Sequence, residues 1–224
     1  PYCWGNSPSG QIGQGGRNTA PVPSAVHGLE DITVTDLSAT TTGVCAITDG
    51  FEAYCWGSNT NGQVGNGTTD NASTPVKVAV AGAVTSIGAG VSHTVAVVDG
   101  IYTPQTIPAV TDSPAGDYPA RAWGEASNGK LGTGSFMAAS TPQTVDFKPG
   151  VPVSRTAAGA NHSCAIAGND VYCWGLNTSG QLGNGTAAAE KFPTKVQGLP
   201  AGQPTGLQAA ANQTCVIVAG EAWC

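Results

Sequence analysis

The sequence predicts an all-β fold: a propeller-like array of about four blades, each with four short strands, that forms a complete or partial β-propeller. Three observations support this prediction. One sequence motif recurs through the chain, short β-prone runs flank tight turns, and no window of a dozen residues has the apolar spacing of a helix.

In the recurring motif, a predicted strand ends at Trp-Gly and a glycine-rich loop follows. The motif appears as "YCWGNSPSGQIGQG", "YCWGSNTNGQVGNGT", "RAWGEASNGKLGTG" and "DVYCWGLNTSGQLGNGT". The intervals are about 50 residues, apart from a longer one that contains an insertion, which predicts one repeat domain over 1–224 within a longer chain. The landmark tryptophans are Trp4, Trp56, Trp123 and Trp174, with Trp223 expected to open a fifth copy. The predicted repeats are about 3–55, 56–122, 123–173 and 174–224.

Each repeat contains a predicted hairpin and further strand signals. In "VCAITDGFEAYCWG", two β-prone runs lie on either side of Asp49-Gly50, and Asp-Gly between such runs is a strong hairpin signal. Similar runs return in "SCAIAGNDVYCWG" and "TCVIVAGEAWC", and the glycine-rich loop is followed by runs such as "STPVKVAV". Each unit therefore offers about four short strands, the content of one propeller blade.

Most of the cysteines fall into pairs across these hairpins. In the copy that lacks them, both positions change together, to Val95 and Ala122, as a bonded couple predicts. Facing residues of an antiparallel pair bring their Cα atoms within disulfide range, and disulfides persist outside the cytosol. Zinc is the alternative, but separate pairs without a shared histidine spacing disfavour it. The predicted disulfides are Cys45–Cys55, Cys164–Cys173 and Cys215–Cys224.

Cys3 is then left without a partner. Its counterpart would lie on a strand before Pro1, and the final "EAWC" overlaps in repeat phase with the initial "PYCWG". We expect either a longer array cut at repeat phase or strand addition between molecules. An odd cysteine also permits a disulfide between chains.

Composition limits the chemistry of the chain. Only 10% of its residues are charged, the net charge is −6, and its eight Lys and Arg residues are scattered, which argues against nucleic acid as a partner. No run reaches the roughly 20 apolar residues of a membrane span. No Ser, His and acidic residue recur in a nucleophile setting, so we expect no enzyme activity, no catalytic residue, no cofactor and no metal.

Several motifs have two interpretations. "GEASNGKL" has the spacing of a phosphate-binding loop up to Lys130, but Leu131 lacks the hydroxyl that coordinates magnesium, and the other copies have glutamine in place of the lysine. His93 and His162 share one repeat position, which favours structural hydrogen bonds over a base or a metal ligand. Glycosylation or asparagine turns both explain the sequons at Asn66, Asn71, Asn161, Asn177, Asn184 and Asn212.

The insertion 99–121 departs most from the repeat. It carries four prolines, two tyrosines and three acidic residues. Prolines reduce the entropy lost on ordering and tyrosine is favoured at recognition surfaces, so we expect a partner-binding loop, with a tolerated surface excursion as the alternative. The candidate contact residues are Tyr102, Asp112, Asp117 and Tyr118.

The phrase Cys-Trp-Gly-x-Asn-x-x-Gly-Gln-Leu-Gly-x-Gly, followed by Pro and Val, resembles the repeat of the regulator of chromosome condensation family, especially its bacterial extracellular relatives. The resemblance covers nearly the whole chain and implies a β-propeller. Nuclear members of that family exchange guanine nucleotides on a small GTPase and bind chromatin, whereas the acidity and the paired cysteines here argue against both roles. Secreted β-lactamase inhibitory proteins with this propeller are a closer functional analogy, which carries over no particular residue.

These observations predict an extracellular, non-enzymatic protein-recognition module, secreted or at the cell surface. Its partner would be another protein or a second copy of the chain, in a homo-oligomer or filament. One alternative is a structural subunit of a surface layer, sheath or filament that assembles through strand or blade complementation. A second alternative is a secreted enzyme inhibitor.

Overall fold

The computed structural model describes residues 1–99, 119–147 and 151–224. These residues form 17 β-strands and one single-turn 3-10 helix, η1 (Ser127–Gly129). Every strand pairs antiparallel with a neighbour in sequence. The predicted all-β, propeller-like fold is therefore confirmed.

Three of the sheets have four strands each, arranged in chain order. One consists of β3 (Val34–Ala39), β4 (Gly43–Thr48), β5 (Ala53–Gly57) and β6 (Ala72–Lys77). The next consists of β7 (Ala83–Ala89), β8 (His93–Asp99), β9 (Ala120–Gly124) and β10 (Ala139–Thr144). The third consists of β11 (Val153–Ala158), β12 (His162–Ala167), β13 (Asp170–Gly175) and β14 (Glu190–Lys195). Smaller sheets are formed by β1 (Tyr2–Gly5) with β2 (Ala20–Ala25), and by β15 (Pro204–Ala210), β16 (Gln213–Val218) and β17 (Glu221–Trp223).

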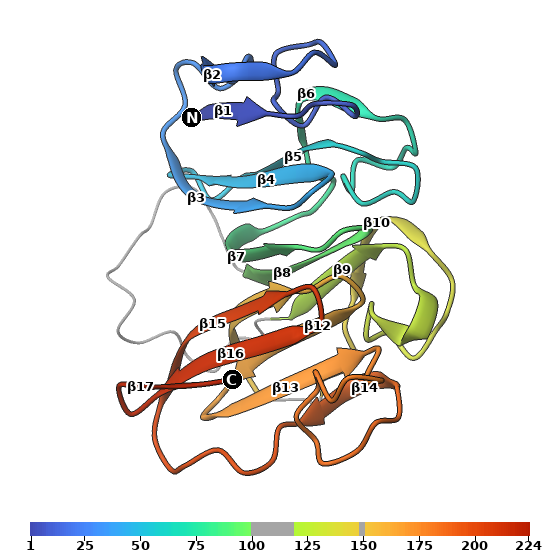
Figure 1. The fold of residues 1–224 in the computed structure, drawn as a ribbon, viewed down its shortest axis with the longest axis vertical. Coiled ribbons are helices and arrows are strands. Elements are labelled where there is room, and N and C mark those ends of the chain that lie inside the picture. Colours follow the sequence, from blue (N-terminus) through green and yellow to red (C-terminus); the bar gives the residue numbers. More distant parts are fainter. Residues whose placement is uncertain (100–118, 148–150) are drawn as a thin grey trace.

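The sheets follow one another along the molecule in chain order. The β1–β2 sheet lies at the top of Figure 1 and the β11–β14 sheet lies near the bottom. The first strands of neighbouring sheets are in contact: β3 contacts β7, β7 contacts β11, and β11 contacts β15. Successive sheets therefore face each other as propeller blades do. No helix in the described ranges is long and apolar enough to cross a membrane.

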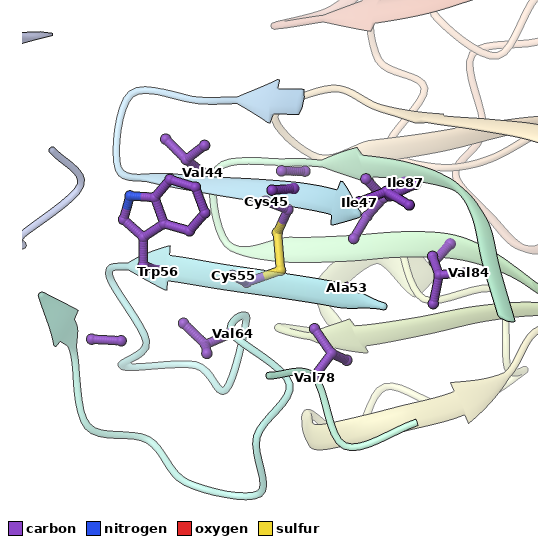
Figure 2. Packing of buried hydrophobic residues seen from close by; sticks show 14 of the residues in the cluster. Val44, Cys45, Ile47, Ala53, Cys55, Trp56, Val64, Val78, Val84 and Ile87 are labelled. Atoms are coloured by element: carbon purple, nitrogen blue, oxygen red, sulfur yellow. A yellow bond between two sulfur atoms is a disulfide. The ribbon is translucent and has the colours of Figure 1, made fainter. Parts of the chain in front are cut away.

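The core lies between facing sheets. In Figure 2, Trp56 and the Cys45–Cys55 disulfide of the β3–β6 sheet lie in one cluster with Val84 and Ile87 of the next sheet. The landmark tryptophans of the three four-stranded sheets are 0% or 1% exposed. Because full burial of a large apolar side chain contributes roughly 2 to 3 kcal/mol, these positions are major sources of stability.

The prediction that Trp223 opens a fifth copy is wrong. Trp223 faces Val216, in the same register in which Tyr54 faces Ala46 in the β3–β6 sheet. The Cys215–Cys224 disulfide fixes this register, which makes Trp223 the counterpart of the tyrosine before the landmark tryptophan. Trp223 is accordingly 38% exposed, unlike the buried landmark residues.

Candidate interaction surface

The predicted contact loop cannot be placed in this fold. Tyr102, Asp112, Asp117 and Tyr118 lie outside the described residues. The described chain stops at Asp99, at the end of β8, and resumes just before β9. The candidate surface is therefore built from the described sheets and loops.

The structure pairs the cysteines that the sequence pairs. Two disulfides join the second and third strands of a sheet, and the third joins β16 to Cys224, the residue directly after β17; the Cα–Cα distances are 4.1, 4.1 and 4.2 Å. Val95 and Ala122 face each other at the corresponding place between β8 and β9. Cys3 is free and half-buried, and burial raises the pKa of its thiol against the opposing effect of the positive N-terminus. The bonded pairs are Cys45–Cys55, Cys164–Cys173 and Cys215–Cys224.

Each buried landmark tryptophan bonds to the glycine-rich loop of the preceding copy. Its indole Nε1 donates a hydrogen bond to the backbone carbonyl of the residue that precedes the aliphatic position of that loop. The bond joins one sheet to the loop of the preceding one and pairs the buried indole N–H, which would otherwise destabilise the fold. The donor–acceptor pairs are Trp56–Gln11 (2.9 Å), Trp123–Gln63 (2.9 Å) and Trp174–Lys130 (3.0 Å).

The two predicted structural histidines extend this contact. The hydroxyl of Ser163 donates to the carbonyl of Lys130 at 2.9 Å, so it accepts from Nε2 of His93, 2.8 Å away in the preceding sheet. His162 and Thr214 repeat the arrangement at 2.9 Å. Burial lowers the pKa of His93 to about 3 and that of His162 to about 4, so both rings are neutral at neutral pH. Among the described residues, no group of three or more His, Cys, Asp and Glu side chains is placed to hold a metal ion.

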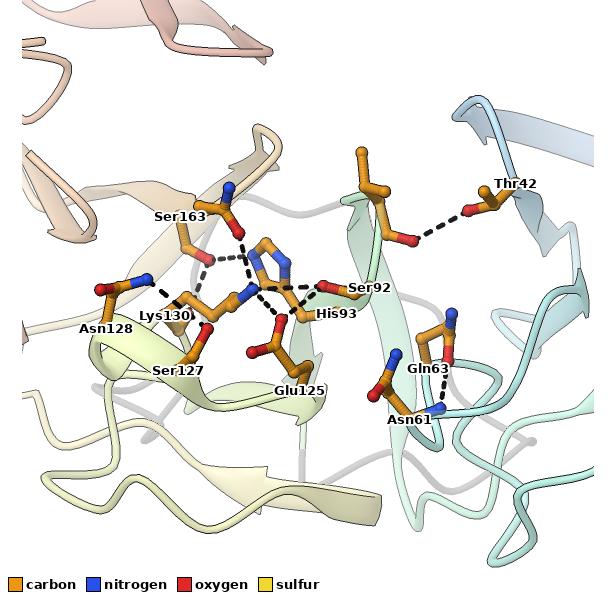
Figure 3. A network of polar contacts seen from close by, with 12 residues as sticks. Thr42, Asn61, Gln63, Ser92, His93, Glu125, Ser127, Asn128, Lys130 and Ser163 are labelled. Atoms are coloured by element: carbon orange, nitrogen blue, oxygen red, sulfur yellow. Dashed lines mark hydrogen bonds and ion pairs between the residues drawn. The ribbon is translucent and has the colours of Figure 1, made fainter.

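Lys130 occupies the place that glutamine has in the other copies, and its side chain is fully buried. Its ammonium donates to Oδ1 of Asn161 at 2.8 Å. It also donates to Oγ of Ser92 at 3.2 Å and forms an ion pair with Glu125, as Figure 3 shows. Burial would raise the pKa of Glu125, but hydrogen bonds from Lys130, Ser127 and Ser92 outweigh it and lower the pKa to about 2. The ammonium is thus bonded inside the protein, which argues against a phosphate site.

The sequon asparagines differ in their surroundings. Asn177 is fully buried, and Asn66 and Asn184 each accept a backbone hydrogen bond at 3.1 Å from the threonine two residues later. These are asparagine turns. Asn212 is exposed in the turn between β15 and β16.

A surface patch that the sequence analysis missed lies where the loop after β9 meets β14. Phe136 and Met137 in the loop are 64% and 80% exposed, and Phe192 in β14 is 41% exposed. The ammonium of Lys191 lies 5.9 Å from the ring centroid of Phe136 and 5.4 Å from that of Phe192. Alignment of the copies would have revealed this site, because the preceding copy has Thr-Asp in place of Phe-Met.

Four-stranded antiparallel sheets that face one another in chain order, joined by a repeated tryptophan bond, define a repeat-built β-propeller. The sequence pattern of the regulator of chromosome condensation (RCC1) repeat matches residues 52–97, 122–166 and 169–217. A second pattern for the same repeat matches residues 153–181. The chain belongs to the RCC1 repeat family.

Similar proteins are larger than this chain. Ultraviolet-B receptor UVR8 of Arabidopsis thaliana is 28% identical over 197 residues, which cover 86% of this chain and 41% of UVR8. E3 ubiquitin-protein ligase HERC2 of Homo sapiens is 28% identical over 200 residues, which cover 88% of this chain and 4% of HERC2. The chain therefore spans less than half of either relative.

Two solved structures share the fold. Human WBSCR16 has a TM-score of 0.75 at 21% identity, over 94% of this chain and 51% of its own. Prp20p of Saccharomyces cerevisiae has a TM-score of 0.71 at 19% identity, over 94% of this chain and 49% of its own. At these identities, the likeness establishes the fold alone.

Proposed function

We propose that this chain is an extracellular, non-enzymatic module for protein recognition. The observation that carries the proposal is that the polar groups recurring between copies are turned inward. The three buried landmark indoles and both paired histidines bond to a neighbouring sheet or its loop. Lys130, which replaces a recurring glutamine, also bonds to the next sheet through Asn161. Side chains that differ between copies, among them Phe136, Met137 and Phe192, lie at the surface, as suits a rigid scaffold that presents a binding surface.

The disulfides support the extracellular setting. Disulfides form and persist in oxidising compartments, and three of the hairpins here carry one. Each closes a short loop and would stabilise the fold by about 3 kcal/mol in the chain-entropy model. A chain that depends on these bonds is suited to secretion or to the cell surface.

Related propellers provide a precedent for protein binding. The structure of Prp20p is described together with its binding properties to Gsp1p and histones, and yeast RCC1 (Prp20) is known bound to Kap60. We carry over the capacity of this type of propeller to bind proteins, and none of those partners.

The extracellular setting is tested by alkylating free thiols in intact cells of the source organism before lysis. We expect the six paired cysteines to be protected from alkylation until a reductant is added. Alkylation of all six without reductant would contradict the proposed setting.

Recognition is tested by immobilising the oxidised chain and, as a matched control, the same chain after reduction and alkylation. We expect the oxidised chain alone to retain a secreted or surface protein, and the purified partner to bind it saturably. Equal retention by the two forms would overturn the proposal, because folded structure would then be irrelevant to binding.

A further inference from the structure

We propose that Phe136, Met137, Phe192 and Lys191, here called the phenylalanine patch, bind an extended segment of a partner protein that carries an apolar side chain beside a carboxylate. This inference rests on the proposed role in protein recognition and specifies the chemistry of the partner. It follows from the exposure, packing and charge of the patch, and from the absence of aromatic residues at the equivalent positions of the preceding copy.

The patch exposes a continuous apolar surface. Its three apolar side chains are 64%, 80% and 41% exposed. Single exposed apolar residues are common on proteins, but adjoining ones mark contact surfaces. Both phenyl rings lie within 6 Å of one ammonium group, so they form one surface and not two separate sites.

Packing holds the patch in its binding arrangement. The ring of Phe192 rests on Gly134 of the preceding copy, where an added Cβ atom would lie 2.6 Å from the ring. The contact orders the inner edge of the ring while leaving its outer face exposed. A side chain that is already ordered loses less entropy when a partner binds.

The repeat architecture does not require aromatic residues at this place. One copy earlier, Thr69 and Asp70 stand in the loop positions and Thr141 stands in the outer-strand position. Thr141 packs on Gly67 there through its methyl group, which lies 3.8 Å from the place that an added Cβ atom of Gly67 would take. The aromatic side chains are therefore specific to the Gly134–Phe192 junction, because threonine stands at the outer-strand position of both the Gly15–Thr74 and the Gly67–Thr141 junctions.

Lys191 defines the charge of the partner. In the described ranges, no carboxylate lies within 4.0 Å of its ammonium, which instead faces the two phenyl rings. A cation over aromatic rings retains its attraction for an anion. A partner carboxylate would pair with this ammonium while a neighbouring apolar side chain covered the rings. The other described lysines are already paired, as Lys77–Glu52, Lys130–Glu125 and Lys195–Asp170.

An open hollow of about 620 Å³ adjoins the patch at Met137. Polar side chains from the loop and from β10 line it, among them Ser135, Ser140 and Gln143. Such groups can hydrogen-bond to the backbone of an extended segment. The hollow therefore favours a peptide segment as the occupant over a flat apolar surface.

The test uses two fluorescein-labelled peptides, Gly-Ser-Asp-Leu-Phe-Asp-Leu-Ser-Gly and the same sequence with lysine in place of each aspartate. Fluorescence anisotropy measures their binding to the wild-type chain, to Phe136→Thr/Phe192→Thr and to Lys191→Ser. Each new residue is the one found at the equivalent place of another copy, and all three sites are exposed, so we expect the variants to fold. Val22→Thr, which removes an apolar side chain that is 62% exposed at the same outer-strand position but outside the phenylalanine patch, is the matched control.

We expect the acidic peptide to bind the wild-type chain and the control at least about tenfold more tightly than it binds either patch variant, and more tightly than the lysine peptide binds. Equal binding to the wild-type chain and the double threonine variant, no preference for the acidic peptide, or no binding at millimolar concentration would overturn the proposal. So would dimerisation of the wild-type chain that the double variant abolishes, because the occupant would then be a second copy. If a partner found by immobilisation binds the patch variants normally, the patch fails while the recognition role stands.

Discussion

The indole nitrogen of Trp123 in β9 lies 2.9 Å from the carbonyl oxygen of Gln63, which belongs to the loop between β5 and β6 of the preceding sheet. The hydroxyl of Thr94 donates to the same oxygen, also at 2.9 Å. The tryptophan ring in turn lies against Gly65, two residues after the acceptor. The loop that contains Gln63 and Gly65 thus accepts two hydrogen bonds from the next sheet and packs against its tryptophan ring.

Trp123→Phe should lower the free energy of unfolding by about 2 to 3 kcal/mol. The change removes one hydrogen bond and leaves a small cavity, although Thr94 still satisfies the carbonyl. Urea unfolding followed by circular dichroism measures the loss. Trp4→Phe is the control, because Trp4 is 61% exposed and its replacement should cost less than about 0.5 kcal/mol. Similar losses in the two variants would show that the buried bond adds nothing.

Gly65→Ala should be more destabilising than Gly185→Ala. Both glycines have a φ of +79°, so each alanine bears a backbone cost of about 1 to 2 kcal/mol. At Gly65 the new Cβ would also lie 2.5 Å from Nε1 of Trp123, whereas at Gly185 it meets nothing within 4 Å. We expect a total loss of about 3 kcal/mol or more for Gly65→Ala in urea unfolding. Equal losses would mean that the ring moves aside freely.

The double variant Val95→Cys/Ala122→Cys should form a fourth disulfide. The two residues face each other in the register that the native cysteine pairs occupy, and the pair would close the loop that contains the insertion. Longer closed loops gain more stabilisation in the chain-entropy model, so we expect a gain of up to about 3.5 kcal/mol. Mass spectrometry after air oxidation detects the bond as the loss of two hydrogens. Two alkylatable thiols at these positions after oxidation would refute the shared register.

Stability should fall as the pH drops below about 6.5, the ordinary histidine value. His93 and His162 stay neutral when folded, with pKa values near 3 and 4, whereas the unfolded chain binds protons at both. The unfolded state therefore binds more protons, and each histidine contributes a slope of up to about 1.4 kcal/mol per pH unit. Urea unfolding between pH 7 and 5 measures this slope while most carboxylates remain ionised.

Replacing both histidines with glutamine separates their effect from other titrations. The next copy has Gln213 at this position, so the substitution suits the repeat. We expect His93→Gln/His162→Gln to be less stable at pH 7 but to have a flatter pH dependence. An unchanged slope would show that neither ring is the titrating group.

The features that depend on repetition could be predicted from the sequence. The joint change to Val95 and Ala122 identified a facing pair, and the structure places those residues opposite each other. The shared position of His93 and His162 indicated hydrogen bonding, and both rings bond to a hydroxyl in the next sheet. A pattern that repeats in several copies reflects the backbone that the copies share, so an interpretation of one copy can be checked against the others.

Features that belong to one copy were harder to predict. Residue type alone misplaced Trp223, because register is set by the partner strand and the disulfide. Lys130 is buried with its ammonium bonded to Glu125 of its own loop and to Asn161 of the turn between β11 and β12, and only the fold brings that turn to the loop. The interaction of Phe136 with Phe192 likewise requires two copies to be placed side by side.

The bond between Trp123 and Gln63 has a consequence for how such chains change length. Donor and acceptor come from successive copies, so a gene that gains or loses one whole copy recreates the same bond at the new junction. A deletion that removes only the tryptophan half of a copy loses the indole donor, and the carbonyl then keeps the hydroxyl of Thr94 as its partner. Duplication or loss of whole repeats therefore preserves the contacts between neighbouring sheets, so the number of repeats can change without loss of this bond.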